Sequence, residues 1–170
     1  MHPLIAKLRG GDLRSIGRSE EVAADVLADP PLFTVLMDGI LSDDALIRMR
    51  AADAAEKVTT RHPEWLVPYK DELLNEIAAI SQQEVRWHAA IMLTRITWTE
   101  AERKQAVSIL KSWLDDKSRI VQVFSLQALA DLSEQDARLK SEVIALIKKK
   151  MKTGPPSIQS RGQKLLRQLT

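Results

Sequence analysis

The sequence predicts an all-α fold: a right-handed α-α superhelix (solenoid) of about four to five helical hairpins, in one domain spanning residues 1–170. Three observations support this prediction. A helical pattern of apolar and small residues recurs at spacings of 38, 36 and 37 residues, and a fixed period of this size is typical of stacked helical arrays. The composition is rich in Leu, Ala, Ile, Lys, Arg and Glu, most of which favour helix. No stretch shows the sustained apolar–polar alternation of a strand.

The repeated pattern is clearest in residues 84–96, EVRWHAAIMLTRI. A β-branched apolar residue opens it, Arg or Gln follows, and two mostly small residues stand four and five positions after the opening. The four copies open at Ile47, Val85, Val121 and Ile158. The small residues Ala51, Ala89 and Gly162 are expected where two helices approach closely, because a larger side chain would hold the backbones apart.

The first helices are predicted from cap and breaker residues. Residues 1–10 form a short helix or arm that ends at two glycines. Ser19 is expected to cap the next helix, because two acidic residues and an apolar run follow it. Pro30 and Pro31 end that helix, and Pro31 suits the start of the following one. The remaining helices are expected at residues 32–41, 45–60, 65–80, 84–96, 101–114, 119–132, 137–152 and 157–169.

Short connections of this kind favour antiparallel hairpins. A hairpin alone would expose an apolar face, which stacking against the next hairpin buries. The pattern Asp43-Asp44 followed by Ile47-Arg48 and Ala51-Ala52 resembles the HEAT repeat, a member of the armadillo-like group. The copies that open at Val85 and Val121 are similar to it, and the resemblance covers most of residues 30–170. It implies a solenoid, and it carries little information on function, because such arrays host many activities.

The sequence offers no recognisable catalytic or cofactor site, and we expect a protein that is not an enzyme and holds no cofactor or metal. There is no cysteine, which excludes thiolate ligands and nucleophiles. His2, His62 and His88 are far apart, and no Gly-rich phosphate loop or nucleophile elbow is present. Neither an apolar run of 18 residues nor a signal peptide is found, so a cytoplasmic protein is expected.

The candidate partner-binding site lies on the second helix of each hairpin. On a helical wheel, Trp87 and Ile91 lie nearly opposite the stripe that contains Val85 and Ala89. In HEAT-like arrays the second helices line the concave surface, so the resemblance implies an apolar row there, edged by cations. The candidate residues are Met49, Arg50, Trp87, His88, Ile91, Arg95, Val123 and Gln127. The alternative is that Trp87 and Trp98 pack between repeats.

A second, weaker candidate site would bind anions at the basic end of the chain. Residues 1–100 hold 11 Lys and Arg against 16 Asp and Glu, whereas residues 101–170 hold 14 against 7. The candidate residues are Lys148, Lys149, Lys150, Lys152, Arg161 and Lys164. Cations at the end of a helix also offset its dipole, which explains the lysine run without any ligand.

Two functions are consistent with these patterns. The first is a non-catalytic scaffold, a monomer or weak homo-oligomer, that binds another protein through the concave face. The alternative is a nucleic-acid-binding array similar to HEAT-like DNA-repair glycosylases, which would use the basic C-terminal half.

Overall fold

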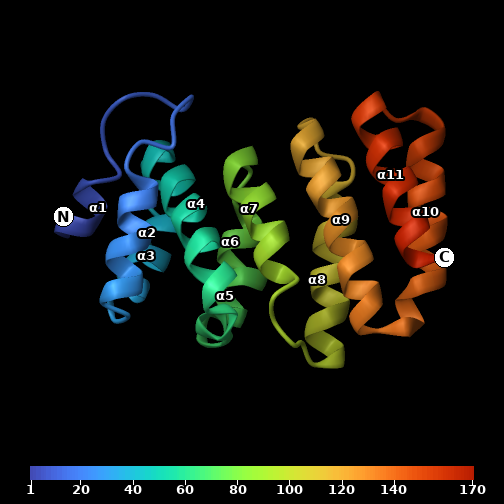
Figure 1. Ribbon diagram of the computed structural model, residues 1–170, viewed down its shortest axis with the longest axis horizontal. Coiled ribbons are helices and arrows are strands. Elements are labelled where there is room, and N and C mark those ends of the chain that lie inside the picture. Colours follow the sequence, from blue (N-terminus) through green and yellow to red (C-terminus); the bar gives the residue numbers. More distant parts are fainter. The chain divides into compact units, whose positions relative to one another are not determined.

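The computed structural model describes residues 1–170, which form helices and connecting turns and no strand. The all-α prediction is therefore confirmed. The chain divides into two compact units, Met1–Ile96 and Thr97–Thr170 (Figure 1). We call them unit 1 and unit 2. The superhelix and the single domain over residues 1–170 stay predictions. None of the helices has the length and apolar character needed to cross a membrane.

Unit 1 is organised around its longest helix, α4, which packs against α2, α3, η1 and α7. The short helix α1 packs on α3. An irregular loop joins α1 to α2 and extends beyond the end of α2 (Figure 1). The helices of unit 1 are α1 (Pro3–Ala6), α2 (Ser19–Ala28), α3 (Leu32–Ile40), α4 (Ala45–Arg61), η1 (Pro63–Tyr69), α5 (Lys70–Leu74), α6 (Glu76–Ala79) and α7 (Gln83–Leu93).

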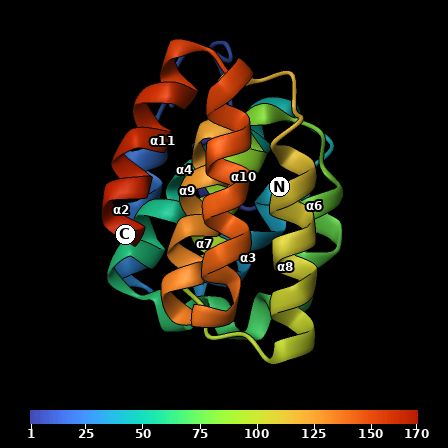
Figure 2. The same cartoon turned by 90° about the vertical axis from the view of Figure 1, so that its right-hand side faces the viewer.

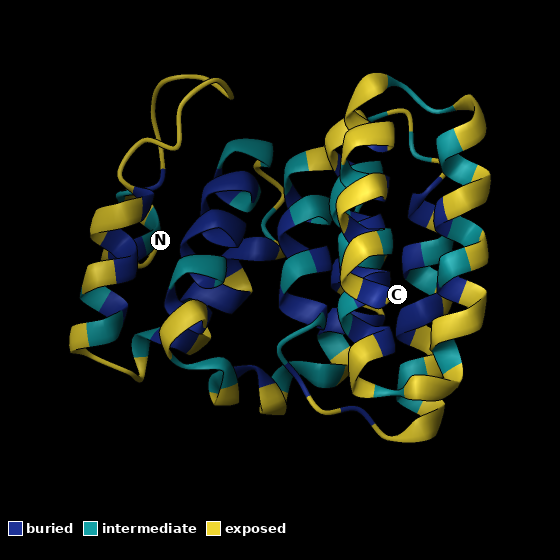
Figure 3. Cartoon of the chain, turned by 45° about the vertical axis from the view of Figure 1, so that its right-hand side comes forward, coloured by how far each residue is buried: buried dark blue, intermediate teal, exposed yellow.

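Unit 2 is organised around α9, which packs against α8, α10 and α11. Helices α10 and α11 lie side by side (Figure 2). Their outer faces are exposed, whereas the residues between helices are buried (Figure 3). The helices of unit 2 are α8 (Glu100–Trp113), α9 (Arg119–Gln135), η2 (Ala137–Leu139), α10 (Lys140–Thr153) and α11 (Pro156–Leu169).

The second residue of each repeat copy makes the same kind of hydrogen bond, although it is Arg in two copies and Gln in the other two. Its side chain donates a hydrogen bond to a backbone carbonyl in the turn that precedes its helix. The bonds are Arg48 Nη1 to Ser42 O at 2.8 Å, Arg86 Nε to Ile80 O at 2.9 Å, Gln122 Nε2 to Asp116 O at 2.5 Å and Gln159 Nε2 to Gly154 O at 3.1 Å. Turn carbonyls need such donors. Arg48 also donates to Asp43 O and to Gln82 Oε1.

Side chains also cap the helices. Asp44 caps α4, accepting hydrogen bonds from the backbone N–H groups of Leu46 and Ile47. Thr99 and Glu102 form a capping box at the start of α8, in which each side chain accepts from the other residue's backbone N–H. The second Asp of the HEAT-like pattern thus caps the helix that carries the first repeat copy.

The prediction of a single helix over residues 65–80 is wrong. Residues 63–69 form a 3-10 helix, and the short helices α5 and α6 follow it. Pro68 lies inside the 3-10 helix and supplies no N–H for an α-helical bond. Asn75 then breaks the helix with backbone angles of −120° and −82°, while its side-chain amide donates to Asp71 O. The helix expected over 84–96 ends at Leu93.

Small residues lie at close helix contacts, as predicted. Ala51 of α4 is fully buried and faces Gly39 of α3, where an added Cβ would lie 3.1 Å from the Ala51 Cβ. A Cβ on Gly162 of α11 would lie 2.5 Å from the Met151 Sδ of α10. These contacts leave no room for a larger side chain without displacement of a neighbour.

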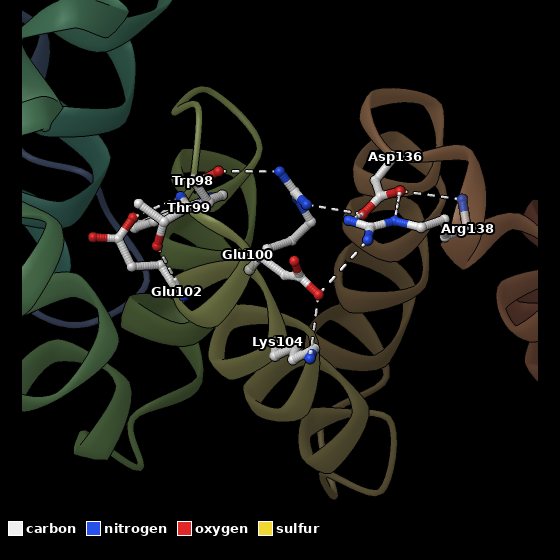
Figure 4. A network of polar contacts seen from close by, with 8 residues as sticks. Trp98, Thr99, Glu100, Glu102, Lys104, Asp136 and Arg138 are labelled. Carbon is white, nitrogen blue, oxygen red and sulfur yellow. Dashed lines mark hydrogen bonds and ion pairs between the residues drawn. The ribbon is translucent and has the colours of Figure 1, made fainter.

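Unit 2 contains a network of charged side chains that joins the start of α8 to η2 (Figure 4). Arg103 donates to Trp98 O at 3.0 Å and to Asp136 Oδ2 at 2.8 Å. Arg138 donates to both oxygens of Asp136 at 3.0 Å. Glu100 pairs with Lys104 and Arg138 at 3.3 and 3.6 Å. These charges satisfy one another, so we interpret the network as structural.

The network predicts an acid-sensitive contribution to stability. Hydrogen bonds from Arg138, together with the charge of Arg103, lower the pKa of Asp136 to about 2. An unfolded Asp has a pKa of about 3.9, so its contribution is complete above about pH 4 and disappears as the pH falls through about 2. We expect Asp136→Asn to destabilise the protein at pH 6, with a difference from the wild type that shrinks between pH 4 and pH 2. Urea unfolding at each pH measures it, and a constant difference would contradict this role.

Candidate partner-binding site

The structure divides the predicted partner-binding residues between the two units. Val123 and Gln127 belong to unit 2. Six belong to unit 1: Met49, Arg50, Trp87, His88, Ile91 and Arg95. Within unit 1, the side chains of Met49, Arg50 and His88 are buried, with exposed fractions of 6%, 1% and 2%. Arg50 and His88 therefore do not form the exposed edge that was expected of them, whereas Trp87 and Ile91 are half-buried.

Arg50 is buried because the loop between α1 and α2 covers it. Its guanidinium donates four hydrogen bonds, all to backbone carbonyls of residues 8–15. They join Nε to Ser15 O at 3.0 Å, Nη1 to Leu8 O at 2.8 Å and to Gly10 O at 2.6 Å, and Nη2 to Asp12 O at 3.3 Å. No carboxylate takes part in these bonds. Carbonyl dipoles thus replace water around a charge that is otherwise costly to bury.

A second polar cluster lies one helical turn farther along α4. Asp53 is 7% exposed, and its Oδ2 accepts from Ser19 Oγ at 2.5 Å and from Lys57 Nζ at 2.7 Å. Its Oδ1 lies 3.6 Å from His88 Nε2 of α7. Ser19 was predicted to cap α2, and this prediction is wrong: the residue is the first of the helix, and its hydroxyl is fully buried against Asp53. The cluster ties α2, α4 and α7 together.

His88 is neutral at physiological pH. Burial lowers the pKa of its imidazole to about 4, against the opposing attraction of Asp53. Its Nδ1 is buried and has no hydrogen-bond partner. Its ring stacks on Trp87, with the two ring centroids 3.5 Å apart. Only Trp87 of this pair reaches the surface, so the pair contributes an aromatic side chain to it rather than a charge.

A pocket of about 180 Å³ opens between this aromatic pair and the loop. Its walls come from the loop, α4 and α7. The lining residues are Leu13, Arg14, Ser15, Ile16, Met49, Asp53, Glu84, Trp87 and His88. Pockets that hold small molecules and cofactors usually measure about 300–1,000 Å³. This one is the size of a single side chain, which favours a peptide over a cofactor.

The remaining predicted residues of unit 1 have structural contacts. The guanidinium of Arg95 donates to Glu56 O at 2.5 Å and to Thr59 Oγ1 at 2.8 Å, and it forms an ion pair with the Glu56 carboxylate. It lies in the turn after α7 and ties that turn to α4. Among the other tryptophans, Trp113 is buried as expected, and Trp98 is 3% exposed. Trp65 is only half-buried.

The predicted residues of unit 2 also engage neighbours within the unit. Gln127 Oε1 accepts from Arg161 Nη1 at 2.8 Å, and Gln127 Nε2 donates to Asp131 Oδ1 at 2.9 Å. The Arg161 guanidinium lies 6.0 Å from the centre of the Phe124 ring. Burial raises the pKa of Asp131. Val123 is half-buried on the same helix, α9.

Of the residues proposed to bind anions, four are exposed on α10 and α11: Lys148, Lys149, Lys152 and Lys164. Lys150 instead pairs with Asp115 at 2.5 Å, and Arg161 is held by Gln127.

The sequence interpretation missed the loop between α1 and α2 as part of the site. Leu13 and Ile16 are 50% and 42% exposed, yet both line the pocket. The available signal was two apolar residues isolated between the glycine pair and Gly17. What the sequence could not reveal is that this loop lies over Arg50.

No protein-family model matches the chain, and a search of curated proteins finds no significant relative.

Proposed function

We propose that this protein is a non-catalytic, HEAT-like scaffold that binds a partner protein through the face of unit 1 formed by α4 and α7. The observation that carries the proposal is the half-buried Trp87, stacked on a neutral histidine beside a pocket of about 180 Å³. Aromatic side chains in desolvated pockets are the commonest anchors of protein interfaces. Ile91, one turn farther along α7, extends the apolar surface.

The charge of unit 1 favours a basic partner. Residues 1–96 hold 11 Lys and Arg against 15 Asp and Glu, a net charge of −4. Glu84 lines the pocket, and Glu20 lies 3.6 Å from Lys57 at the edge of the Asp53 cluster. Complementary charge accelerates association and excludes acidic partners. A partner segment with an apolar anchor flanked by Lys or Arg would suit this face.

Trp87→Ala is expected to weaken partner binding at least about 30-fold, which corresponds to a loss of about 2 kcal/mol. The partner is first captured from cell extract on the immobilised chain, identified by mass spectrometry and purified. Its affinity is then measured by calorimetry. Val67→Ala is the control, because Val67 is 52% exposed and does not line the pocket. Equal affinities for wild type and Trp87→Ala, with both chains folded, would overturn the proposal.

A further inference from the structure

The loop between α1 and α2, residues 9–18, occupies the same face that we propose for the partner. Every residue in it is exposed, and it contains no helix or strand. We call it the strap. It lies over Arg50, and its apolar side chains Leu13 and Ile16 line the pocket beside Trp87. The side chains of Leu13 and Ile16 are only partly buried there, with exposed fractions of 50% and 42%.

The contacts between the strap and Arg50 do not depend on the strap's side chains. Arg50 reaches Gly10 O, Asp12 O and Ser15 O, so its donors bind the peptide backbone. The strap is not extended: Gly10 and Gly17 have positive φ, and turns lie at residues 13–14 and 17–18. A partner segment that makes similar turns would offer the same acceptors. Recognition of backbone groups supplies affinity, while side-chain pockets supply selectivity.

The strap also matches the face in charge. It contains three Arg and one Asp, a net charge of +2. Without the strap, residues 1–96 hold 8 Lys and Arg against 14 Asp and Glu, a net charge of −6. The strap is thus a basic, turn-rich segment with two apolar residues three positions apart, beside an apolar pocket, and the rest of its unit is acidic.

We infer that the strap competes with the partner for this face: it covers Arg50 and the pocket in the free protein, and a basic segment of the partner that makes similar turns displaces it. This inference rests on the proposed function. The carbonyl oxygens of the partner segment then accept hydrogen bonds from Arg50, and its apolar side chains, spaced like Leu13 and Ile16, lie beside Trp87. With such a contact, the apparent affinity for the partner equals the intrinsic affinity multiplied by the fraction of molecules in which the strap is open.

Two glycines of the strap provide a matched pair of variants. Gly17 and Gly10 both have positive φ, at +54° and +84°, so alanine strains the backbone at each position. A Cβ on Gly17 would lie 2.6 Å from Arg50 Cζ, whereas a Cβ on Gly10 meets no atom within 4 Å. Gly17→Ala should therefore release the strap from Arg50, and Gly10→Ala should leave it in place.

The experiment compares these full-length variants in two measurements. Trypsin should cleave after Arg14 about tenfold faster in Gly17→Ala than in Gly10→Ala, because cleavage follows the population of the open form. A synthetic peptide with the sequence of residues 9–18 should bind Gly17→Ala at least about tenfold more tightly than it binds Gly10→Ala or the wild type. A peptide of the same composition, with the apolar residues moved apart, should bind none of them.

A second variant guards against a folding defect in Gly17→Ala. Leu13→Ala/Ile16→Ala changes only exposed side chains, and it should also accelerate cleavage and raise affinity for the peptide and for the purified partner. If Leu13→Ala/Ile16→Ala binds the partner more weakly, the loop is part of the interface and the competitor inference is overturned. If the strap opens but the peptide does not bind, the inference is overturned too. If only the Trp87→Ala prediction fails, so that this variant binds the partner as tightly as the wild type does, the proposed function is rejected. The measurements of strap opening still stand in that case.

Discussion

Asp53→Ala is expected to reduce the free energy of unfolding by about 3 kcal/mol, because it removes the acceptor shared by three helices. The Ser19 hydroxyl is fully buried and would lose its acceptor at 2.5 Å. The Lys57 ammonium would lose its partner at 2.7 Å, although its side chain is 32% exposed and part of that cost is recovered by hydration.

Two comparisons separate the buried cluster from an ordinary ion pair. Asp53→Asn keeps an acceptor for Ser19 and loses only the charge, so it should cost less than Asp53→Ala. Glu100→Ala breaks pairs whose side chains are 60% or more exposed, and it should cost less than about 0.5 kcal/mol. Urea unfolding followed by circular dichroism measures all three. Equal losses for Asp53→Ala and Glu100→Ala would show that the cluster does not join the helices.

Ala51→Leu is expected to destabilise unit 1 by about 3 kcal/mol, through overpacking between α3 and α4. Ala51 is fully buried, and the facing position is a glycine with almost no space above it. Three additional carbon atoms would push the two helices apart, and α4 carries most of the packing of unit 1.

The control for this prediction is Ala145→Leu, at an exposed position of α10, which should change stability by less than about 0.5 kcal/mol. Hydrogen exchange shows where the destabilisation falls: amides of α3 and α4 should lose protection in Ala51→Leu. Wild-type protection in both helices would mean that the contact tolerates a larger residue, which would contradict the role assigned to the small repeat position.

The repeat made much of each unit's fold predictable, because the same side-chain hydrogen bond recurs in every copy. Arg48 and Gln122 differ in charge and size, yet both donate to a carbonyl of the preceding turn. The repeat pattern has Arg at this position in two copies and Gln in the other two. In physical terms the position needs a donor of sufficient length rather than a charge.

The failures have local causes. The helix expected over 65–80 is interrupted at two residues: Pro68 has no backbone N–H to donate, and the side chain of Asn75 competes for a backbone hydrogen bond. The spacing of apolar residues carries no information about either effect. Ser19 looked like a cap because acidic residues follow it, but a buried carboxylate from 34 positions away outcompetes the backbone for its hydroxyl. Contacts at that separation are not visible in a local pattern.

The candidate site was predicted only in part, for the same reason. Trp87 could be assigned to a face because helical spacing fixes its direction. Arg50 shares that face, yet it is buried, because a loop about 40 positions earlier in the chain lies over it. Repeat periodicity carries no information about an irregular segment outside the repeats, so the strap could be found only from the structure.

Hydrogen exchange of the full chain, with and without the purified partner, tests the central claim most directly. If the partner binds the α4–α7 face and displaces the strap, amides of residues 84–91 gain protection. The strap's carbonyl groups then leave Arg50, and the amides of this freed segment exchange faster. Protection confined to residues 97–170, with residues 84–91 and the strap unchanged, would contradict the account and place the interaction on unit 2.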